Sequence, residues 1–282
     1  MSLAYASELL TKARTAGYAV GAFNMYNLET LQAIISAAEE LRAPVLVQVN
    51  AGTAEFMGQQ TVANLVRQLA AAATVPVALH LDHGKSFDEV MTALRLGYTS
   101  VMFDGSSLSL EANADATREV GKVAHSMGVP VEGELGRIAG SKAGEDLTES
   151  DLTTPEGAKA FVEATGVDSL AIGVGTQHGL YRQPPELRFD LLEGIARQVT
   201  LPLVMHGGTG VSGEDIQHAV SLGISKFNVA TGLKVSFMQT LEQQFQAKPG
   251  EQDLRKLMSL ARTQVQTMVA EYIQLLGCAG KA

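Results

Sequence analysis

The sequence predicts an α/β protein built as a single (β/α)8 TIM barrel, with one domain over residues 1–282, an extra N-terminal helix and a C-terminal helical extension. Two observations predict this fold. Eight short apolar runs rich in β-branched residues are spread over most of the chain, and segments with helical periodicity alternate with them. Such alternation indicates a parallel sheet, and eight units in one uninterrupted chain favour a closed barrel over an open doubly wound sheet.

The expected strands are all short apolar runs that end at polar residues. They are residues 19–23, 45–49, 77–81, 99–103, 130–134, 168–173, 202–206 and 225–229. An additional helix is expected around residues 4–16. A helical region from about residue 233 carries an apolar stripe that would cover the barrel or a second subunit. The polar, acidic connection 136–154 is long for a compact domain, and such loops are typically lids or disordered.

Composition excludes several classes of protein. The formal net charge is -9 and no cluster of Lys and Arg occurs, which argues against nucleic-acid binding. No stretch approaches the ~20 apolar residues that span a bilayer, and the first residues do not resemble a secretion signal. The single cysteine, Cys278, excludes a disulfide framework and fits a reducing compartment. We therefore expect a soluble cytoplasmic protein with no nucleic-acid or membrane partner.

Every expected strand leads to a polar residue at its carboxyl end, where the active site of a (β/α)8 barrel is built. In chain order these residues are Asn24, Asn50, Asp82 with His83, Asp104, Glu134, His178, His206 and Asn228. Turn chemistry explains a single Asn or Asp at such a place, and any one histidine alone fits a hydrogen-bonded structural role. Together, three neutral imidazoles from different strands, with no cysteine available, indicate a zinc site with an open position for substrate.

The other histidines are expected to have supporting roles. His125 and His218 fall within helical segments, where surface or packing roles are expected. His80 precedes Asp82 by two positions, so it faces the same side of the strand, one layer deeper in the barrel. We expect His80 to orient Asp82 or a metal ligand.

Glycines stand beside two of the proposed ligands. GTQHG at 175–179 and HGGTG at 206–210 would let backbone amides approach an anion closely. NVATG at 228–232 follows the eighth strand and opens a helix, which is the usual phosphate position in such barrels together with the loop after strand seven. Either segment alone also fits a simple turn, but their pairing predicts a phosphate site.

These motifs together closely resemble the class II fructose- and tagatose-bisphosphate aldolases. The likeness runs in order through LHLDHG at 79–84, EGELG at 132–136, GTQHGLY at 175–181, HGGTGV at 206–211 and NVATGLK at 228–234, with weaker agreement at 21–27 and 279–282. It covers nearly the whole chain.

The resemblance implies that His83, His178 and His206 bind Zn²⁺, and that Asp82 exchanges a proton with the hydroxyl at the carbon–carbon bond being cleaved. Zinc on the carbonyl oxygen would stabilise the enediolate as a Lewis acid. We therefore expect cleavage of a ketose 1,6-bisphosphate, tagatose or fructose, to dihydroxyacetone phosphate and glyceraldehyde 3-phosphate. A monovalent cation (Na⁺ or K⁺) near the phosphate and a homodimer or homotetramer are also implied.

The resemblance assigns further residues to the substrate. The expected contacts are Asn24, Asn50, Gly179, Gly207, Gly208, Thr209, Asn228, Val229, Ala230 and Thr231. Asp104 and Glu134 match carboxylates near the metal, as alternative ligands or as residues that order the ligands. Arg255 stands where the family has an arginine reaching across a dimer interface to the second phosphate, although the usual preceding proline is Leu254 here.

The loop 136–154 is expected to carry an acid that shuttles the proton of the dihydroxyacetone phosphate carbon. We favour Glu145 for this role, against a solvated lid charge.

Other functions remain open from the sequence. Lys226 shares the strand parity of Asn228, so a Schiff-base aldolase is one alternative, although it leaves three histidines without a purpose. A metal-dependent phosphosugar epimerase needs the same metal and phosphate groups on this fold. A non-catalytic aldolase partner subunit would be free to lose ligands that this chain retains. An aldolase of the same family acting on a phosphorylated deoxyketo-acid is the last alternative.

Overall fold

The eight predicted strands form a closed parallel barrel. The computed structural model describes residues 3–138, 148–181 and 183–282. The strands follow one another around the barrel in chain order, and the last pairs with the first. They are β1 Val20–Asn24, β2 Val45–Asn50, β3 Val77–Gly84, β4 Ser100–Phe103, β5 Val131–Leu135, β6 Ser169–Ile172, β7 Leu203–Met205 and β8 Ile224–Val229. Each predicted strand is confirmed, with each end displaced by at most one residue except in β3, which continues three residues further.

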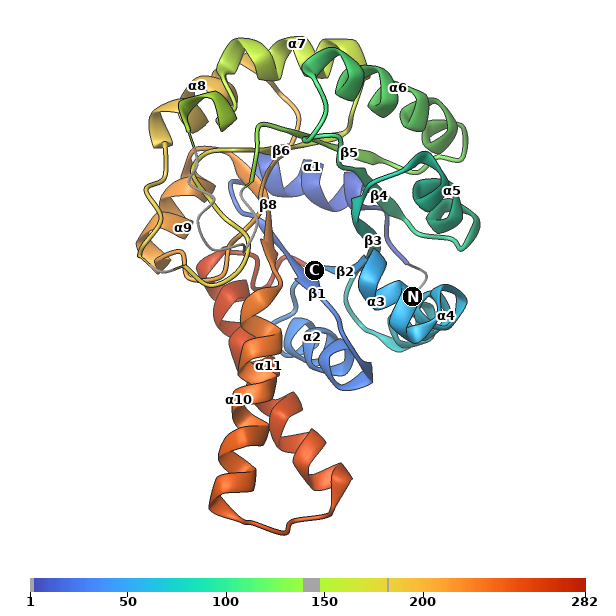
Figure 1. Cartoon of the computed structure of the whole chain (residues 1–282), viewed down its shortest axis with the longest axis vertical. Helices are drawn as coiled ribbons and strands as arrows, with labels where there is room; N and C mark the ends of the chain where they lie inside the picture. The colour runs from blue at the N-terminus through green and yellow to red at the C-terminus, as the bar shows by residue number, and fades with distance from the viewer. Residues whose placement is uncertain (1–2, 139–147, 182) are drawn as a thin grey trace.

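Helices surround the barrel (Figure 1). They are α1 Ala6–Ala16, α2 Leu28–Glu40, α3 Ala51–Met57, α4 Gln59–Ala72, α5 Phe87–Arg95, α6 Leu110–Ser126, α7 Pro155–Thr165, α8 Phe189–Gln198, α9 Gly213–Ser221, α10 Thr231–Ala247 and α11 Leu254–Leu275, with a 3₁₀ turn at Glu149–Asp151. Local sequence explains several starts: Asn27 and Thr30 form a capping box, and Thr154 caps α7 ahead of Pro155. In the described parts of the chain, no helix combines the length and apolar character needed to cross a bilayer.

The barrel has an apolar outer layer and a mixed interior, because side chains alternate along each strand. Phe23 and Phe227 face outward and pack around Tyr272 of α11. Inside, a small apolar cluster of Met102, Ala171 and Val204 lies beside polar groups. Among the polar groups, Lys226 of β8 reaches both His80 of β3 and the side chain of Glu132 on β5. These contacts join strands that are not neighbours, so they cross the interior of the barrel.

Helix α1 covers the end of the barrel opposite the strand carboxyl ends. The amide of Ala4 donates to the carbonyl of Val77, at the start of β3, at 2.8 Å. Arg14 donates to the carbonyl of Val199 at 2.9 Å, just before β7. Leu9 and Leu10 are buried against the strands. The predicted N-terminal helix is therefore confirmed and belongs to the barrel core.

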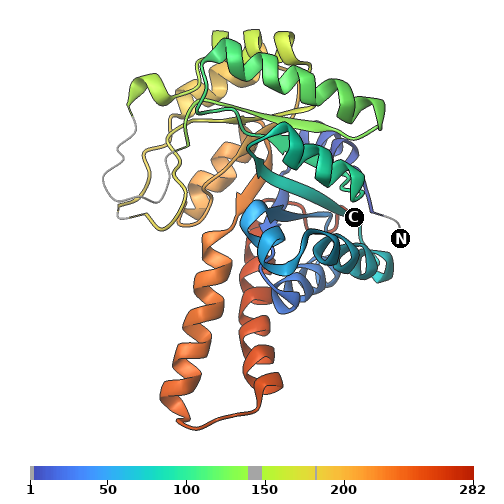
Figure 2. The same ribbon diagram turned by 45° about the vertical axis from the view of Figure 1, so that its right-hand side comes forward.

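Helices α10 and α11 form a hairpin whose outer end projects away from the barrel (Figures 1 and 2). The inner part of α11 packs on α2, where Arg262 donates to Gln32 at 3.0 Å. The buried stripe of α11 consists of Leu257, Ala261, Val265, Val269 and Ile273. It covers the barrel, which is one of the two possibilities expected from the sequence.

Replacing Leu10 with Ala should lower the free energy of unfolding by about 2–5 kcal/mol, because it leaves a cavity between α1 and the strands. The check is urea denaturation followed by circular dichroism. Leu108→Ala, at a half-exposed leucine, is the control and should change stability by no more than about 0.5 kcal/mol. Equal stability of the two variants would contradict the packing of α1 described here.

Candidate active site

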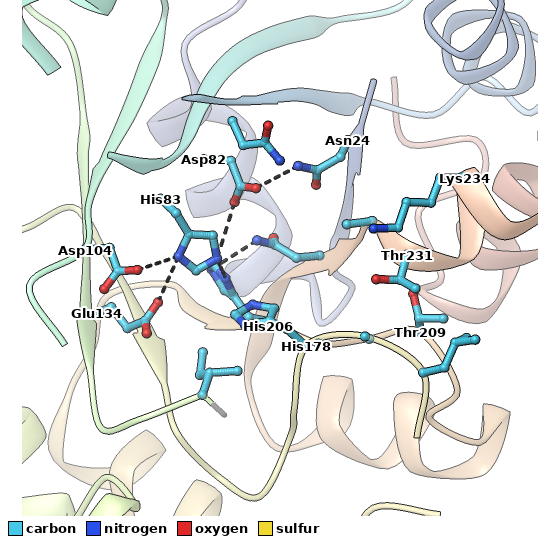
Figure 3. A pocket seen from close by; sticks show the side chains of 18 of the residues that line it. Asn24, Asp82, His83, Asp104, Glu134, His178, His206, Thr209, Thr231 and Lys234 are labelled. Atoms are coloured by element: carbon cyan, nitrogen blue, oxygen red, sulfur yellow. Dashed lines mark hydrogen bonds and ion pairs between the residues drawn. The ribbon is translucent and has the colours of Figure 1, made fainter. Parts of the chain in front are cut away.

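The polar residues at the strand ends line one cavity of about 760 Å³ at the carboxyl end of the barrel (Figure 3). Its wall includes Asn24, Asn50, Asp82, His83, Asp104, Glu134, His178, His206 and Asn228, which are all of the strand-end residues singled out in the sequence. The same wall carries Gly179, Gly207, Gly208, Thr209, Ala230 and Thr231. A cavity of this volume is in the range that holds small-molecule ligands.

An unusual backbone conformation brings Asp82 and His83 into the same cavity. Neighbouring residues of a regular strand point to opposite faces. Here the β3–β4 pairing shifts register between Leu81 and Gly84, and His83 has a positive φ of 54°. This left-handed conformation is strained for a residue with a side chain, and such strain is characteristic of functional sites. The register shift ends at Gly84, where the backbone passes so close to β4 that a Cβ would lie 2.7 Å from the carbonyl oxygen of Met102.

The three histidines predicted to bind metal converge. His206 Nδ1 lies 3.1 Å from His83 Nε2, and His178 packs edge-on to His83 with ring centroids 4.9 Å apart. One nitrogen from each ring lies within 4.8 Å of the others. With Zn–N bonds of about 2.0–2.1 Å and tetrahedral angles, two ligand nitrogens stand about 3.3 Å apart. The residues therefore fit a zinc ion.

Electrostatics also favour a cation where the three rings meet. Burial lowers the pKa of His83, but Asp82, Asp104 and Glu134 together raise it to about 9. Burial and the neighbouring His83 lower the pKa of His178 to about 4, and the same causes lower that of His206. Without a metal, only two of the three imidazoles are therefore neutral at pH 7. The ionised carboxylates of Asp82 and Asp104 supply the negative potential that a divalent cation requires.

Asp82 is held with one oxygen free to act. Its Oδ2 accepts a hydrogen bond from Asn24 at 2.7 Å, and Asn24 in turn accepts one from Gln48 at 3.1 Å. Among the described residues, the buried Oδ1 has no hydrogen-bond partner, and it lies 3.8 Å from His83 Nε2. Burial raises the pKa of Asp82, but His83, His206 and the bond from Asn24 outweigh this and lower it. Asp82 is thus an ionised, oriented base.

Asp104 and Glu134 differ in their surroundings. Asp104 accepts hydrogen bonds from His83 Nδ1 at 2.6 Å, from Ser106 and from Lys85. Burial raises the pKa of Asp104, but these bonds hold it well below its usual range. Burial raises the pKa of Glu134 to about 8, and its Oε2 lies 3.7 Å from His83 Nδ1. Asp104 therefore fixes the orientation of His83, whereas Glu134 makes the looser contact.

The loops after β7 and β8 form a cradle beside the histidines. Gly207 has a φ of 69°, and a Cβ there would collide with the backbone of Gln177. Thr209 Oγ1 accepts a hydrogen bond from the amide of Gly232 at 2.9 Å, which ties the β7 loop to the first turn of α10. Helix N-termini and glycine amides bind anions. Val229 is buried and does not line the cavity, unlike its neighbours.

Tyr181 holds the loop that carries His178. Its hydroxyl donates to the carbonyl of Gly207 at 2.9 Å and accepts from the amide of Gln177 at 2.9 Å. The β6 loop is thereby attached to the β7 loop next to His206. Sequence reasoning did not assign this role, although the tyrosine belongs to the GTQHGLY motif.

A buried group of polar residues lies below the three converging histidines. His80 contacts Ser100 at 2.7 Å and Lys226 at 3.1 Å, and no contact with Asp82 is present in the described structure. Of the two roles expected for His80, a contact with Asp82 is not found in the described structure, because Asn24 makes that contact. The other role, support of a metal ligand, stays a prediction, and His80 is linked to His206 through Lys226 and Glu132. Lys226 is fully buried, pairs with Glu132 at 2.7 Å and does not line the cavity, so it is poorly placed for a Schiff base. Sequence reasoning missed Glu132, although it shares the inward parity of Glu134.

Two of the predicted residues are not found on the cavity wall of the described structure. The Arg255 side chain is 93% exposed at the start of α11, 3.6 Å from Asp253, and does not line the cavity of its own chain. Glu145 lies outside the described residues. His125 contacts Asp168 at the surface, and His218 packs on Phe189, as expected for residues without a catalytic role.

Comparisons with known proteins agree with this geometry. The sequence profile of the family described as class-II fructose-bisphosphate aldolase matches residues 4–281. A sulfofructosephosphate aldolase of Alkalicoccus urumqiensis is 40% identical, with 99% of each chain covered. The structure is similar to the YdjI aldolase from Escherichia coli K12 (TM-score 0.89, 34% identity, 99% of each chain). It is also similar to a candidate fructose-1,6-bisphosphate aldolase from Coccidioides immitis (TM-score 0.87, 30% identity, 97% of this chain and 96% of that one). The chain therefore belongs to the class II fructose-bisphosphate aldolase family.

Proposed function

We propose that this protein is a zinc-dependent aldolase that cleaves a ketose 1,6-bisphosphate to dihydroxyacetone phosphate and glyceraldehyde 3-phosphate. One observation carries the proposal: the three converging imidazoles, the ionised Asp82 and the glycine-rich cradle line the same cavity. This combination supplies a metal, a base and an anion site for one small substrate.

The chain's own residues account for binding and proton transfer. The cradle of Gly207, Gly208 and Thr209 would hold the phosphate of the ketose and so orient the carbonyl towards the histidines. The chemistry that zinc supplies when bound is Lewis-acid polarisation of this carbonyl. Asp82 Oδ1 would take the proton of the C4 hydroxyl. The C3–C4 bond then breaks, its electron pair passes to C3, and the aldehyde leaves.

Protonation of C3 completes the cycle, and Glu145 is our proposed acid for this step. We further propose that Arg255 meets the second phosphate in a neighbouring subunit of a homodimer or homotetramer, because its exposed side chain does not line the cavity of its own chain. A monovalent cation near the cradle would help to neutralise the first phosphate.

A second candidate substrate is a sulfofructose phosphate. The observation that favours it is the 40% identity to the sulfofructosephosphate aldolase over the full length of both chains. By its name such a substrate is a fructose phosphate that also carries a sulfo group, so the cradle would bind its phosphate as it would one phosphate of a ketose bisphosphate. The reaction at C3 and C4 would be unchanged.

A metal chelator should abolish cleavage, and added zinc should restore it, because His83, His178 and His206 are the groups proposed to hold the metal. The measurement is aldol cleavage coupled to reduction of the triose phosphate, together with elemental analysis of the protein. Activity that survives removal of all metal, with borohydride trapping of a lysine by substrate, would favour the Schiff-base mechanism instead.

Asp82→Asn should lower kcat by about 10²–10⁴-fold, because the amide cannot accept the hydroxyl proton. Zinc content should stay at the wild-type level. Asp104→Asn is the matched variant, and it should instead weaken zinc binding by about 10–100-fold through loss of the contact to His83 Nδ1. A rate near that of the wild type in zinc-loaded Asp82→Asn would rule out the proposed base.

Cleavage assays of zinc-loaded protein should identify the substrate. Fructose 1,6-bisphosphate, tagatose 1,6-bisphosphate, a sulfofructose phosphate and a phosphorylated deoxyketo-acid are compared by kcat/KM. We expect one ketose phosphate to exceed the others by at least about tenfold, equivalent to about 1.4 kcal/mol in the transition state. Turnover of none of them would refute the proposed activity.

A further inference from the structure

A continuous row of buried side chains runs beneath the proposed metal ligands. Ser100 Oγ contacts His80 Nδ1 at 2.7 Å, and His80 Nε2 lies 3.1 Å from Lys226 Nζ. Lys226 Nζ donates to Glu132 Oε2 at 2.7 Å, and Glu132 Oε1 lies 2.9 Å from His206 Nε2. All five side chains are at most 4% exposed. The row therefore ends on a residue proposed to bind zinc.

Donor and acceptor chemistry gives each member of the row one role. An ammonium group only donates, so His80 Nε2 must accept from Lys226, and His80 Nδ1–H donates to Ser100. A carboxylate only accepts, so Glu132 takes one hydrogen bond from Lys226 and a second from His206 Nε2–H. Asn228 Nδ2 lies 3.0 Å from the same nitrogen, and Asn228 Oδ1 has no hydrogen-bond partner among the described residues. Because His206 Nε2–H has no lone pair to accept with, we assign the amide turned over, so that Oδ1 faces the ring and accepts from this N–H. His206 Nδ1 is then the atom left with a lone pair.

That lone pair lies on the side of the ring that faces the other ligands. His206 Nδ1 is 3.1 Å from His83 Nε2, and the ring of His178 lies on the same side of the cavity (Figure 3). Metal-binding histidines commonly donate their second N–H to a carboxylate, which fixes the ring and its tautomer. Glu132 occupies this position for His206, as Asp104 does for His83.

Stability alone is a weak reason to bury the pair of Lys226 and Glu132. Removing two charges from water is costly, and replacing such a pair by apolar residues of similar volume is often neutral or stabilising. The pair spans the barrel between β8 and β5, where well-packed apolar side chains fill the interior of many barrels. Its contact with His206 provides a function that an apolar pair would lack.

We propose that Lys226 and Glu132 are positioning residues for zinc. Glu132 holds His206 with Nδ1 directed at the metal, and Lys226 compensates the buried charge of Glu132 and holds its carboxylate in place. The proposal rests on the proposed function in one respect, namely that His206 binds zinc.

Zinc affinity of the substrate-free protein tests the proposal by competition with a fluorescent chelator. Lys226→Met leaves the charge of Glu132 uncompensated, and zinc affinity should fall by about 10–100-fold. In Lys226→Met/Glu132→Gln both charges are absent, but the amide oxygen can still accept from His206, so affinity should largely recover. Arg14→Met is the control, because it removes a cation with a hydrogen bond at the opposite end of the barrel and should leave affinity unchanged.

A second pair of variants keeps the test decisive if Lys226→Met does not fold. Lys226→Met/Glu132→Met and Lys226→Met/Glu132→Gln both remove the charges and differ only in the acceptor for His206. The Met pair should bind zinc at least about tenfold more weakly. ¹⁵N NMR of the metal-free proteins should show a larger fraction of the Nε2–H tautomer of His206 in the Gln pair than in the Met pair, which keeps the acceptor on Asn228 but lacks the one at position 132.

Equal zinc affinity in these two double variants would overturn the role of Glu132. Wild-type affinity in folded Lys226→Met would overturn the role of Lys226. Neither result affects the proposed aldolase activity, which fails only if the wild-type protein itself binds no zinc or cleaves no ketose phosphate.

Discussion

The structure depends on compensating charge inside a closed barrel. Alternation along the strands directs Asp82, Glu132 and Lys226 inward, away from water. A buried charge is tolerated only when it is paired or hydrogen-bonded, so each of these side chains has few allowed orientations. Pairing of buried charges therefore has a second effect: it holds the reactive groups in fixed orientations before a substrate arrives. Such preorganisation is a condition for efficient catalysis.

The fold and most of the site were predictable because both depend on short-range patterns. Apolar β-branched runs define the strands, and a parallel barrel gathers their carboxyl ends at one face whatever the loops do. A residue such as Asp82 or His206 therefore needs only its place at the end of a run to be assigned to the cavity. The glycines beside His178 and His206 were equally visible, because close backbone approach needs glycine.

Other features of the site depend on contacts between residues that are far apart in the sequence, and a local sequence pattern does not predict such contacts. Glu132 and Lys226 are 94 residues apart, and their pairing follows from the size and tilt of the barrel. The register shift that turns His83 into the cavity is invisible in the letters LDHG, which also fit a regular strand. For the same reason the sequence left two possible partners for His80, Asp82 or a metal ligand, since parity gives the face of a strand and not the partner across the barrel.

The site is divided between the barrel and its loops, and for this reason the proposed reaction is better defined than the substrate. In the proposed function the strands and the adjoining cradle bind the phosphorylated ketone, whichever of the candidate ketose phosphates is the substrate. Of the cations that line the cavity in the described part of the chain, Lys85 is engaged with Asp104, and Lys234 lies on the cradle side beside Thr231 (Figure 3). A phosphate and a sulfonate differ in charge, and we propose that groups outside this described wall, such as Arg255 of a neighbouring subunit, distinguish them.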